Sequence, residues 1–244
     1  AVEVFDGVLE ALVAELPLLR ADVRGAPRPR GQVARAMTRA VRRFPERFVT
    51  PMAAVAGAVA DHVLAAMRRG RSLARASVNN GGDIAIWLAP GEAFRIAVAA
   101  DPVTGDRAGT VRVRAGDGIG GIATSGWRGR SHSLGIADAV TVLASDAATA
   151  DAAATLIANA VDLPGDARIA RSPACELAPD SDLGARLVTV DVPVLDAASV
   201  ERALAAGAAR ARAYIDAGRV RAAFLTLQGR SVTVGAASGL IGKE

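Results

Sequence analysis

Three short segments of this 244-residue chain gather polar side chains among small residues, where binding chemistry is expected. The first reads Asn79-Asn80-Gly81-Gly82-Asp83. Its glycines let the backbone turn sharply or approach a ligand closely, and free amides in such a turn can cradle an anion. The asparagines and the aspartate add amide and carboxylate groups. A plain β-hairpin turn has the same composition, because Asn and Gly are the preferred turn residues.

The second segment, residues 118–132, combines glycines with hydroxyls, two arginines and a histidine. Arginine suits phosphate because its planar fork donates two parallel hydrogen bonds, and a tryptophan offers a stacking face. The candidate ligand-binding residues here are Thr124, Ser125, Gly126, Trp127, Arg128 and Arg130. His132 and the nearby Asp138 are candidate acid–base groups. The simpler interpretation of a lone histidine is a surface or packed side chain.

The third segment contains Asp151 and Thr155, four residues apart in a stretch of helical composition. Residues at this spacing lie on one face of a helix, so a carboxylate and a hydroxyl point the same way. Such hard oxygen donors suit Mg²⁺ when ligand phosphates complete its coordination. The alternative is an exposed pair on an alanine-rich helix.

The composition limits the chemistry that these segments can perform. Apolar residues make up 51% of the chain and aromatic residues 3%, so Ala, Val, Leu and Ile must fill a globular core. One cysteine and two histidines exclude an intramolecular disulfide and a His/Cys zinc cluster. The only lysine, Lys243, leaves no lysine for an interior Schiff base or a phosphate loop. With no apolar run of the ~18 residues that span a membrane, and no signal-peptide pattern, we expect a cytoplasmic protein.

Positive charge concentrates between Arg24 and Arg47, although the net charge is only +4. A basic stripe of this kind can touch nucleic acid or a polyphosphate. The simpler interpretation is a solvated helix face. Because only Phe44 and Phe48 offer stacking surfaces nearby, nucleic acid is not the expected partner.

Periodicity predicts the elements that position these residues. Helices are expected over Val4–Val23, Gln32–Arg43, Met52–Arg69, Ala147–Val161 with Asp146 as cap, and Asp196–Gly218. Strands are expected over Ala74–Val78, Ile84–Leu88, Phe94–Ala99, Thr110–Arg114, Ala139–Ala144 and Arg186–Val194, followed by a hairpin of Val220–Leu227 and Ser231–Val234. Residues 164–179 read as a loop. The sum predicts one α+β domain with a helical part (1–50), a motif-bearing core (51–161) and a strand–helix–hairpin part (162–244).

The order of these motifs resembles the ApbE-like family, the FAD:protein FMN transferases, and particularly its shorter branch. Family features matched here are a Gly and an Asp four apart on a helix (Gly57 and Asp61), the Gly81–Asp83 turn, the Thr124–Gly126 element and the Ala150–Thr155 helix start. The resemblance implies a T-fold-related α+β domain with a mixed or antiparallel sheet. It also implies FAD or FMN at the turn and the Thr-Ser-Gly element, Mg²⁺ on Asp151 and Thr155, and a protein acceptor of FMN.

The chain departs from the transferase pattern at two places. Ala56 stands where the family has a lysine, and the stretch from His132 to Asp138 lacks the family's Asp-Pro and Thr-Gly pairs. Binding of a flavin nucleotide or another small phosphate-bearing ligand is therefore expected more than FMN transfer.

Two other functions stay open. One is a different enzyme on the same scaffold, acting on a small cofactor-like substrate with Trp127, Arg128 and Arg130 setting specificity. The other is a binding or assembly protein that uses the basic helices. The small-residue helix Met52–Arg69 suits packing inside the domain or against a second copy of the chain, so a homo-oligomer is compatible with the sequence.

Overall fold

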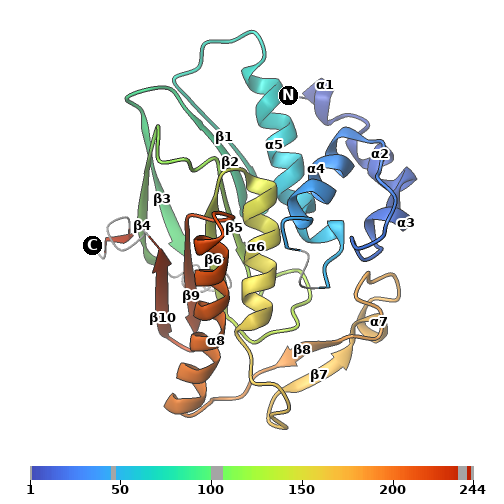
Figure 1. The fold of residues 1–244 in the computed structure, drawn as a ribbon, viewed down its shortest axis with the longest axis vertical. Coiled ribbons are helices and arrows are strands. Elements are labelled where there is room, and N and C mark those ends of the chain that lie inside the picture. The colour runs from blue at the N-terminus through green and yellow to red at the C-terminus, as the bar shows by residue number, and fades with distance from the viewer. Residues whose placement is uncertain (1, 45–47, 100–106, 236–240, 243–244) are drawn as a thin grey trace. The chain divides into compact units, whose positions relative to one another are not determined.

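The computed structural model describes residues 2–44, 48–99, 107–235 and 241–242 (Figure 1). Helices and antiparallel sheets are mixed along the chain, which confirms the predicted α+β class. The chain forms two compact units. The first comprises residues 1–94, 113–123 and 143–153, and the second comprises 95–112, 124–142 and 154–244. Strands β5 (Gly121–Ser125) and β6 (Ala139–Ala144) and helix α6 (Ala147–Ala160) contribute residues to both.

In the first unit, helices pack on antiparallel strands. Its helical elements are α1 (Val2–Phe5), α2 (Val8–Ala14), α3 (Leu16–Leu19), α4 (Gln32–Val41), the 3-10 turn η1 (Pro51–Ala54) and α5 (Val55–Arg68). Strands β1 (Arg75–Asn80), β2 (Asp83–Leu88) and β5 are neighbours in that order. Helix α5 packs on β1 and β2, with Ala60, Leu64, Ala76, Ala85 and Ala147 buried together. Alanine side chains let these backbones lie close to one another.

The prediction of one helix over Val4–Val23 is wrong. The segment forms the three short helices α1, α2 and α3 instead, visible beside α4 and α5 in Figure 1. Gly7 has a φ of 80°, outside the helical region, and separates α1 from α2. Pro17 lies in the first turn of α3 and has no N–H to continue a helix from α2. The spacing of apolar residues does not reveal these two helix breaks.

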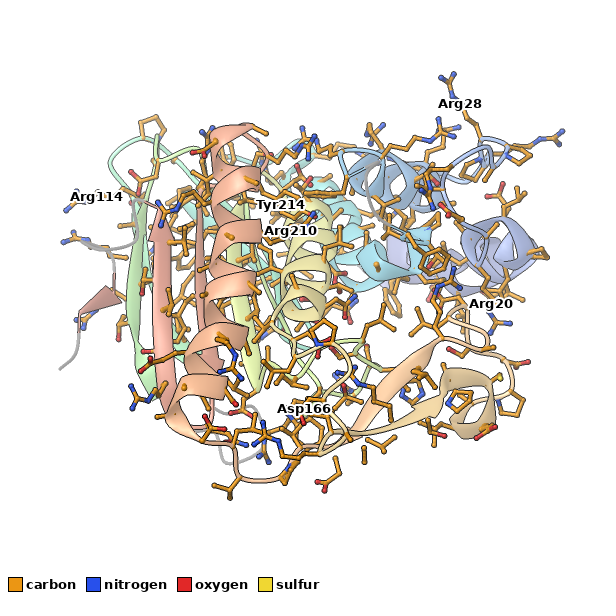
Figure 2. All side chains as sticks on the ribbon, turned by 60° about the horizontal axis from the view of Figure 1, so that its bottom comes forward. Arg20, Arg28, Arg114, Asp166, Arg210 and Tyr214 are labelled. Atoms are coloured by element: carbon orange, nitrogen blue, oxygen red, sulfur yellow. The ribbon has the colours of Figure 1, made fainter. Side chains whose placement is uncertain are left out.

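The second unit contains two main β structures. Strands β6, β9 (Ala222–Leu227) and β10 (Arg230–Gly235) are neighbours in one sheet, and α8 (Ala197–Asp216) packs on β9 and β10. A second sheet has the order β11 (Ile241–Gly242), β4 (Arg107–Arg114), β3 (Ala93–Ala99). Every residue of β6 and β9 is buried, and apart from Thr141 and Thr226 both strands consist of apolar residues. Tyr214 on α8 is buried in this unit with Arg210 above its ring (Figure 2).

Residues 164–179 do not form the predicted loop. They contain strand β7 (Ala170–Pro173) and helix α7 (Ala174–Leu177), and β7 pairs with β8 (Leu187–Asp191). Each element has too few residues to show a hydrophobic periodicity, and β7 is stabilised by its pairing with β8. The other predicted helices and strands are confirmed with shifts at their ends, whereas β5 has only a glycine-rich composition in the sequence. Within the described residues, no helix combines the length and apolarity needed to cross a membrane.

Candidate functional site

Helices α5 and α6 cap each other in the first unit. The Asp61 carboxylate of α5 accepts hydrogen bonds from the N–H groups of Ala147 (3.1 Å) and Ala148 (2.9 Å), which begin α6. In return, the Asp151 carboxylate of α6 accepts the N–H of Gly57 at 3.0 Å, at the start of α5. The first N–H groups of a helix lack partners within it, and a carboxylate also suits the positive end of the helix dipole. Two distant aspartates therefore supply caps that neither helix start supplies completely by itself.

Gly57 makes this reciprocal arrangement sterically possible. A Cβ atom at this position would lie 2.3 Å from the carbonyl oxygen of Ala147 and 2.8 Å from the N of Ala148. These are backbone atoms, so they cannot rotate away as a side chain can. The Gly57–Asp61 pair, matched above to a family motif, thus brings the two helix starts together in this structure.

In the Gly-Gly-Asp segment, Gly81 and Gly82 form the two-residue turn of the β1–β2 hairpin, and Asp83 begins β2. Asn80 pairs with Asp83 across the turn, and Gly81 and Gly82 have φ values of 69° and 111°. Positive φ at both positions is the requirement that glycine meets without strain. The side chain of Asn80 donates to the carbonyl oxygen of Ala56 at 3.1 Å, and Asn79 accepts the N–H of Gly82 at 2.9 Å. The turn is thereby fixed to the start of α5, which also binds Asp151.

The carboxylates of Asp83 and Asp151 interact electrostatically at this place. Burial raises the pKa of Asp151 well above its ordinary value, and the negative charge of Asp83 raises it further, against the opposing effect of the Gly57 and Ala56 N–H groups. Burial also raises the pKa of Asp61 to about 6, although its two backbone hydrogen bonds act in the opposite direction. Neighbouring carboxylates in a partly buried site favour either a proton or a bound cation between them.

The oxygen atoms that could coordinate a cation here are those of the Asp83 and Asp151 carboxylates and the amide oxygen of Asn80, whose nitrogen donates to Ala56. Among the residues that the structure describes, no three His, Cys, Asp or Glu side chains cluster as a metal site. A complete protein cage is thus not formed by these side chains. Mg²⁺ commonly uses one or two carboxylates and takes its remaining oxygens from phosphates and water, and the donor set fits that mode.

The second unit holds Asp138, which the sequence marks as a candidate acid–base group. The residue is 7% exposed, and its carboxylate forms an ion pair with Nε of Arg128 at 2.8 Å. The second carboxylate oxygen accepts the N–H of Gln228, in the turn between β9 and β10. Gln228 has a φ of 46°, and its side chain accepts from Leu195 and donates to Pro193. Asp138 therefore organises a turn and a loop in this structure.

The Thr-Ser-Gly element lies at the end of β5 and just beyond it. The hydroxyl of Thr124 is 2.8 Å from that of Thr141 on β6. A Cβ atom on Gly126 would lie 2.4 Å from the carbonyl oxygen of Asp138, so glycine is required for this close approach. Trp127 donates its backbone N–H to Ala137, and its indole nitrogen is buried without a hydrogen-bond partner among the described residues.

The remaining candidates are spread over the second unit. His132 and Arg130 are exposed, and His132 forms no hydrogen bond or ion pair within the part of the chain that the structure describes. Thr155 lies one helical turn beyond Asp151 on α6 and belongs to the second unit. The structure thus joins Asn80, Asp83 and Asp151 in one unit, and Arg128 with Asp138 in the other.

Sequence reasoning named Asp61 only as part of a family motif, without its capping role, and gave no role to Gln228. Asp61 could have been found from the absence of a polar cap before α5, where Ala54 precedes the helix and makes no side-chain hydrogen bond. Gln228 carried a weaker signal, because glutamine is not a usual turn residue and stands beside Gly229 between two strand-like runs.

Comparisons with known proteins place the chain in a family. A family model described as "AbpE bacteria" matches residues 1–233. The chain belongs to this family. Membership confirms the ApbE-related relationship that the motif order predicts, at the level of the family.

Several archaeal relatives of this AbpE family member are UPF0280 proteins. The protein of Methanopyrus kandleri is 41% identical over 138 residues, which is 56% of this chain and 51% of that protein. The protein of Methanothermobacter thermautotrophicus is 38% identical over 136 residues, covering 55% and 50%. That of Methanosphaerula palustris is 42% identical over 114 residues, covering 46% and 47%. The chain spans about half the length of the curated relatives it matches.

Proposed function

We propose that this protein binds a small phosphate-bearing nucleotide, with FAD and FMN as the first candidates, through a divalent cation held by Asp83 and Asp151. The observation that carries the proposal is that the hairpin turn and Asp151 both bind the start of α5, where Asn80 donates to the Ala56 carbonyl and Asp151 accepts the Gly57 N–H. The negative charge of Asp83, which follows the turn, adds to burial in raising the pKa of Asp151. A cation between them offsets that repulsion and supplies the positive charge that a phosphate needs.

The surroundings of the two carboxylates support a cation that also carries phosphate. Gly81 and Gly82 are exposed, and no heavy atom lies within 4 Å of a Cβ built on Gly82, so a ligand has room above the turn. The side-chain nitrogen of Asn80 donates to the Ala56 carbonyl, and the amide oxygen of Asn80 can serve as a further ligand of the cation. Asp83, Asp151 and Asn80 would hold the cation, and bound Mg²⁺ would supply charge neutralisation to the phosphates.

Binding is the activity proposed, rather than FMN transfer. At Ala56, where the transferase pattern has a lysine, this chain has no side-chain donor, and the backbone N–H of the residue serves the Asp151 carboxylate. The cation is then the main source of positive charge for the ligand in this part of the first unit. Specificity for flavin over other nucleotides stays a prediction that the binding experiment addresses.

The test is a titration of the full chain with FAD, FMN and ATP, each with Mg²⁺ and with EDTA, by calorimetry. Asp151→Asn keeps an oxygen for the Gly57 N–H but removes the negative charge that the cation requires. We expect at least ~10-fold weaker binding in EDTA and in this variant, the loss associated with one charge-assisted contact. The control is Asp146→Asn, since Asp146 caps Thr149 at 2.8 Å in the same helix. Absence of binding by all three nucleotides, or equal binding by both variants, would refute the proposal.

A further inference from the structure

A pocket lined mainly by arginine lies on the first unit and shares no residue with the cation site proposed above. It has a volume of about 300 Å³. Its lining consists of Arg28, Pro29, Arg35, Thr38, Arg39 and Arg42. Among the described residues, no acidic side chain and no aromatic ring contributes to this lining. The pocket thus concentrates positive charge without the neutralising groups or stacking surfaces that would indicate another use.

Three of the arginines share one face of α4 and its C-cap. Arg35, Arg39 and Arg42 follow one another at spacings of four and three residues, so their side chains emerge on the same side of the helix. The opposite face is buried and carries Val33, Ala34, Met37, Ala40 and Val41. Amphipathicity therefore fixes the rotation of α4 and directs all three guanidinium groups toward solvent, where like charges at this spacing repel each other.

The preceding loop completes the pocket and is fixed in place. The N–H groups of Arg30 and Gly31 donate to the carboxylate of Glu15, and Pro29 is buried. Arg35 donates to the carbonyl oxygen of Arg30 at 2.7 Å, and Arg42 donates to that of Ala26 at 3.1 Å. These bonds position two guanidinium forks while leaving most of their donors available.

None of Arg28, Arg35, Arg39 and Arg42 forms an ion pair with any residue in the described ranges. Other arginines of the chain do, as in the pairs Arg24–Asp22 and Arg171–Asp162. Figure 2 shows the labelled side chain of Arg28 projecting outward from the ribbon. Unpaired charge on one fixed surface is an electrostatic footprint for an anion.

A neighbouring pocket provides a contrast within the same unit. It has a volume of about 330 Å³ and also contains Arg39, together with Arg43. Asp61 and Asp146 line it as well, so its charges largely cancel, and the N–H groups at the start of α6 are already occupied by these carboxylates. Of these two pockets, only the four-arginine pocket has the charge that favours an anion.

We propose that the four-arginine pocket binds a small polyphosphate, namely a pyrophosphate or triphosphate group, without a metal ion. Guanidinium forks pair with phosphate oxygens in a bidentate manner, and several forks around one pocket match a ligand with adjacent phosphates. The volume lies at the small end of ligand sites, which suits a phosphate chain. A concave pocket without aromatic side chains favours such a ligand over single-stranded nucleic acid, whose bases stack on aromatic rings.

The experiment titrates the full chain with sodium pyrophosphate and tripolyphosphate in EDTA at low salt, by calorimetry. Arg39→Gln and Arg42→Gln change exposed side chains, so folding is retained and is checked by circular dichroism. We expect one-site binding that weakens about 10-fold or more in each variant, as loss of a charge-assisted bidentate contact implies. The matched control is Arg71→Gln, because Arg71 is also exposed and also donates to a backbone carbonyl, that of Met67.

The outcomes separate this proposal from the cation site. Asp151→Asn is expected to leave metal-free pyrophosphate binding unchanged, so failure of the nucleotide proposal does not remove this one. Absence of binding, or equal weakening in Arg71→Gln, overturns the proposal. Tighter binding of a single-stranded RNA, lost in the same arginine variants, also overturns it and assigns the pocket to nucleic acid.

Discussion

Asp61→Asn tests the reciprocal capping of α5 and α6 through pH. Burial raises the folded-state pKa of Asp61 from 3.8 to about 6. Because the folded pKa is raised, the protein is more stable with Asp61 protonated. The contribution is complete below the unfolded-state pKa and is lost as pH rises through about 6. The whole loss is about 3 kcal/mol, since each pKa unit corresponds to about 1.4 kcal/mol.

Part of this loss falls in a range where stability is readily measured. Between about pH 5 and about pH 7.5, linkage assigns Asp61 a fall of about 1.3 kcal/mol in the free energy of unfolding. Asparagine does not titrate, so the variant is expected to lose that part of the slope. It also gives up one of the two hydrogen bonds from Ala147 and Ala148, a pH-independent cost of about 1 kcal/mol.

The assay is urea denaturation of the parent and variant proteins across this pH range. The control is Asp117→Asn, because Asp117 accepts the N–H of Arg114 in an exposed turn of the same unit and is not part of the helix caps. We expect Asp117→Asn to keep the pH slope of the parent protein and Asp61→Asn to flatten it. An unchanged slope in Asp61→Asn would refute the assignment of Asp61 as a buried, charge-penalised cap.

Two further substitutions test the packing. Gly57→Ala is expected to lower the free energy of unfolding by about 2 kcal/mol, because strain against the Ala147 carbonyl outweighs a gain of about 1 kcal/mol in helix propensity. The control is Ala65→Gly, an exposed substitution in the same helix, whose loss of stability measures the difference in helix propensity between Ala and Gly. A Gly57→Ala protein more stable than the parent would contradict the close approach of the two helices. Asp138→Asn is expected to cost about 2 kcal/mol, because the Gln228 N–H or Arg128 loses a buried acceptor. Thermal denaturation measures this loss of stability, and an unchanged midpoint would contradict the structural role of Asp138.

Local patterns were sufficient for elements whose signals lie within their own sequences. Helix α4 has an apolar face at regular spacing, and the expected capping of α6 by Asp146 is confirmed by the Thr149 N–H at 2.8 Å. The Gly81-Gly82 turn between two strands is confirmed for the same reason. Each of these features depends on residues that are close together along the chain.

The organisation of the candidate site depends on residues that are far apart along the chain. Asp151 meets Gly57 across 94 positions, and Gln228 meets Asp138 across 90. No local propensity encodes such pairs, because each exists only when two elements pack together. The family resemblance singled out Gly57, Asp61 and Asp151, but the caps that they form follow from the structure alone. The arginine pocket was visible in the sequence only as a basic stripe.

The most direct measurement is the calorimetric titration of FAD into the full chain and into Asp151→Asn, each with Mg²⁺ and with EDTA. We expect saturable binding that requires Mg²⁺ and is weakened about 10-fold or more by the substitution, while Asp146→Asn behaves as the parent protein. Mg²⁺-independent binding that Asp151→Asn leaves intact would contradict a cation held by Asp83 and Asp151.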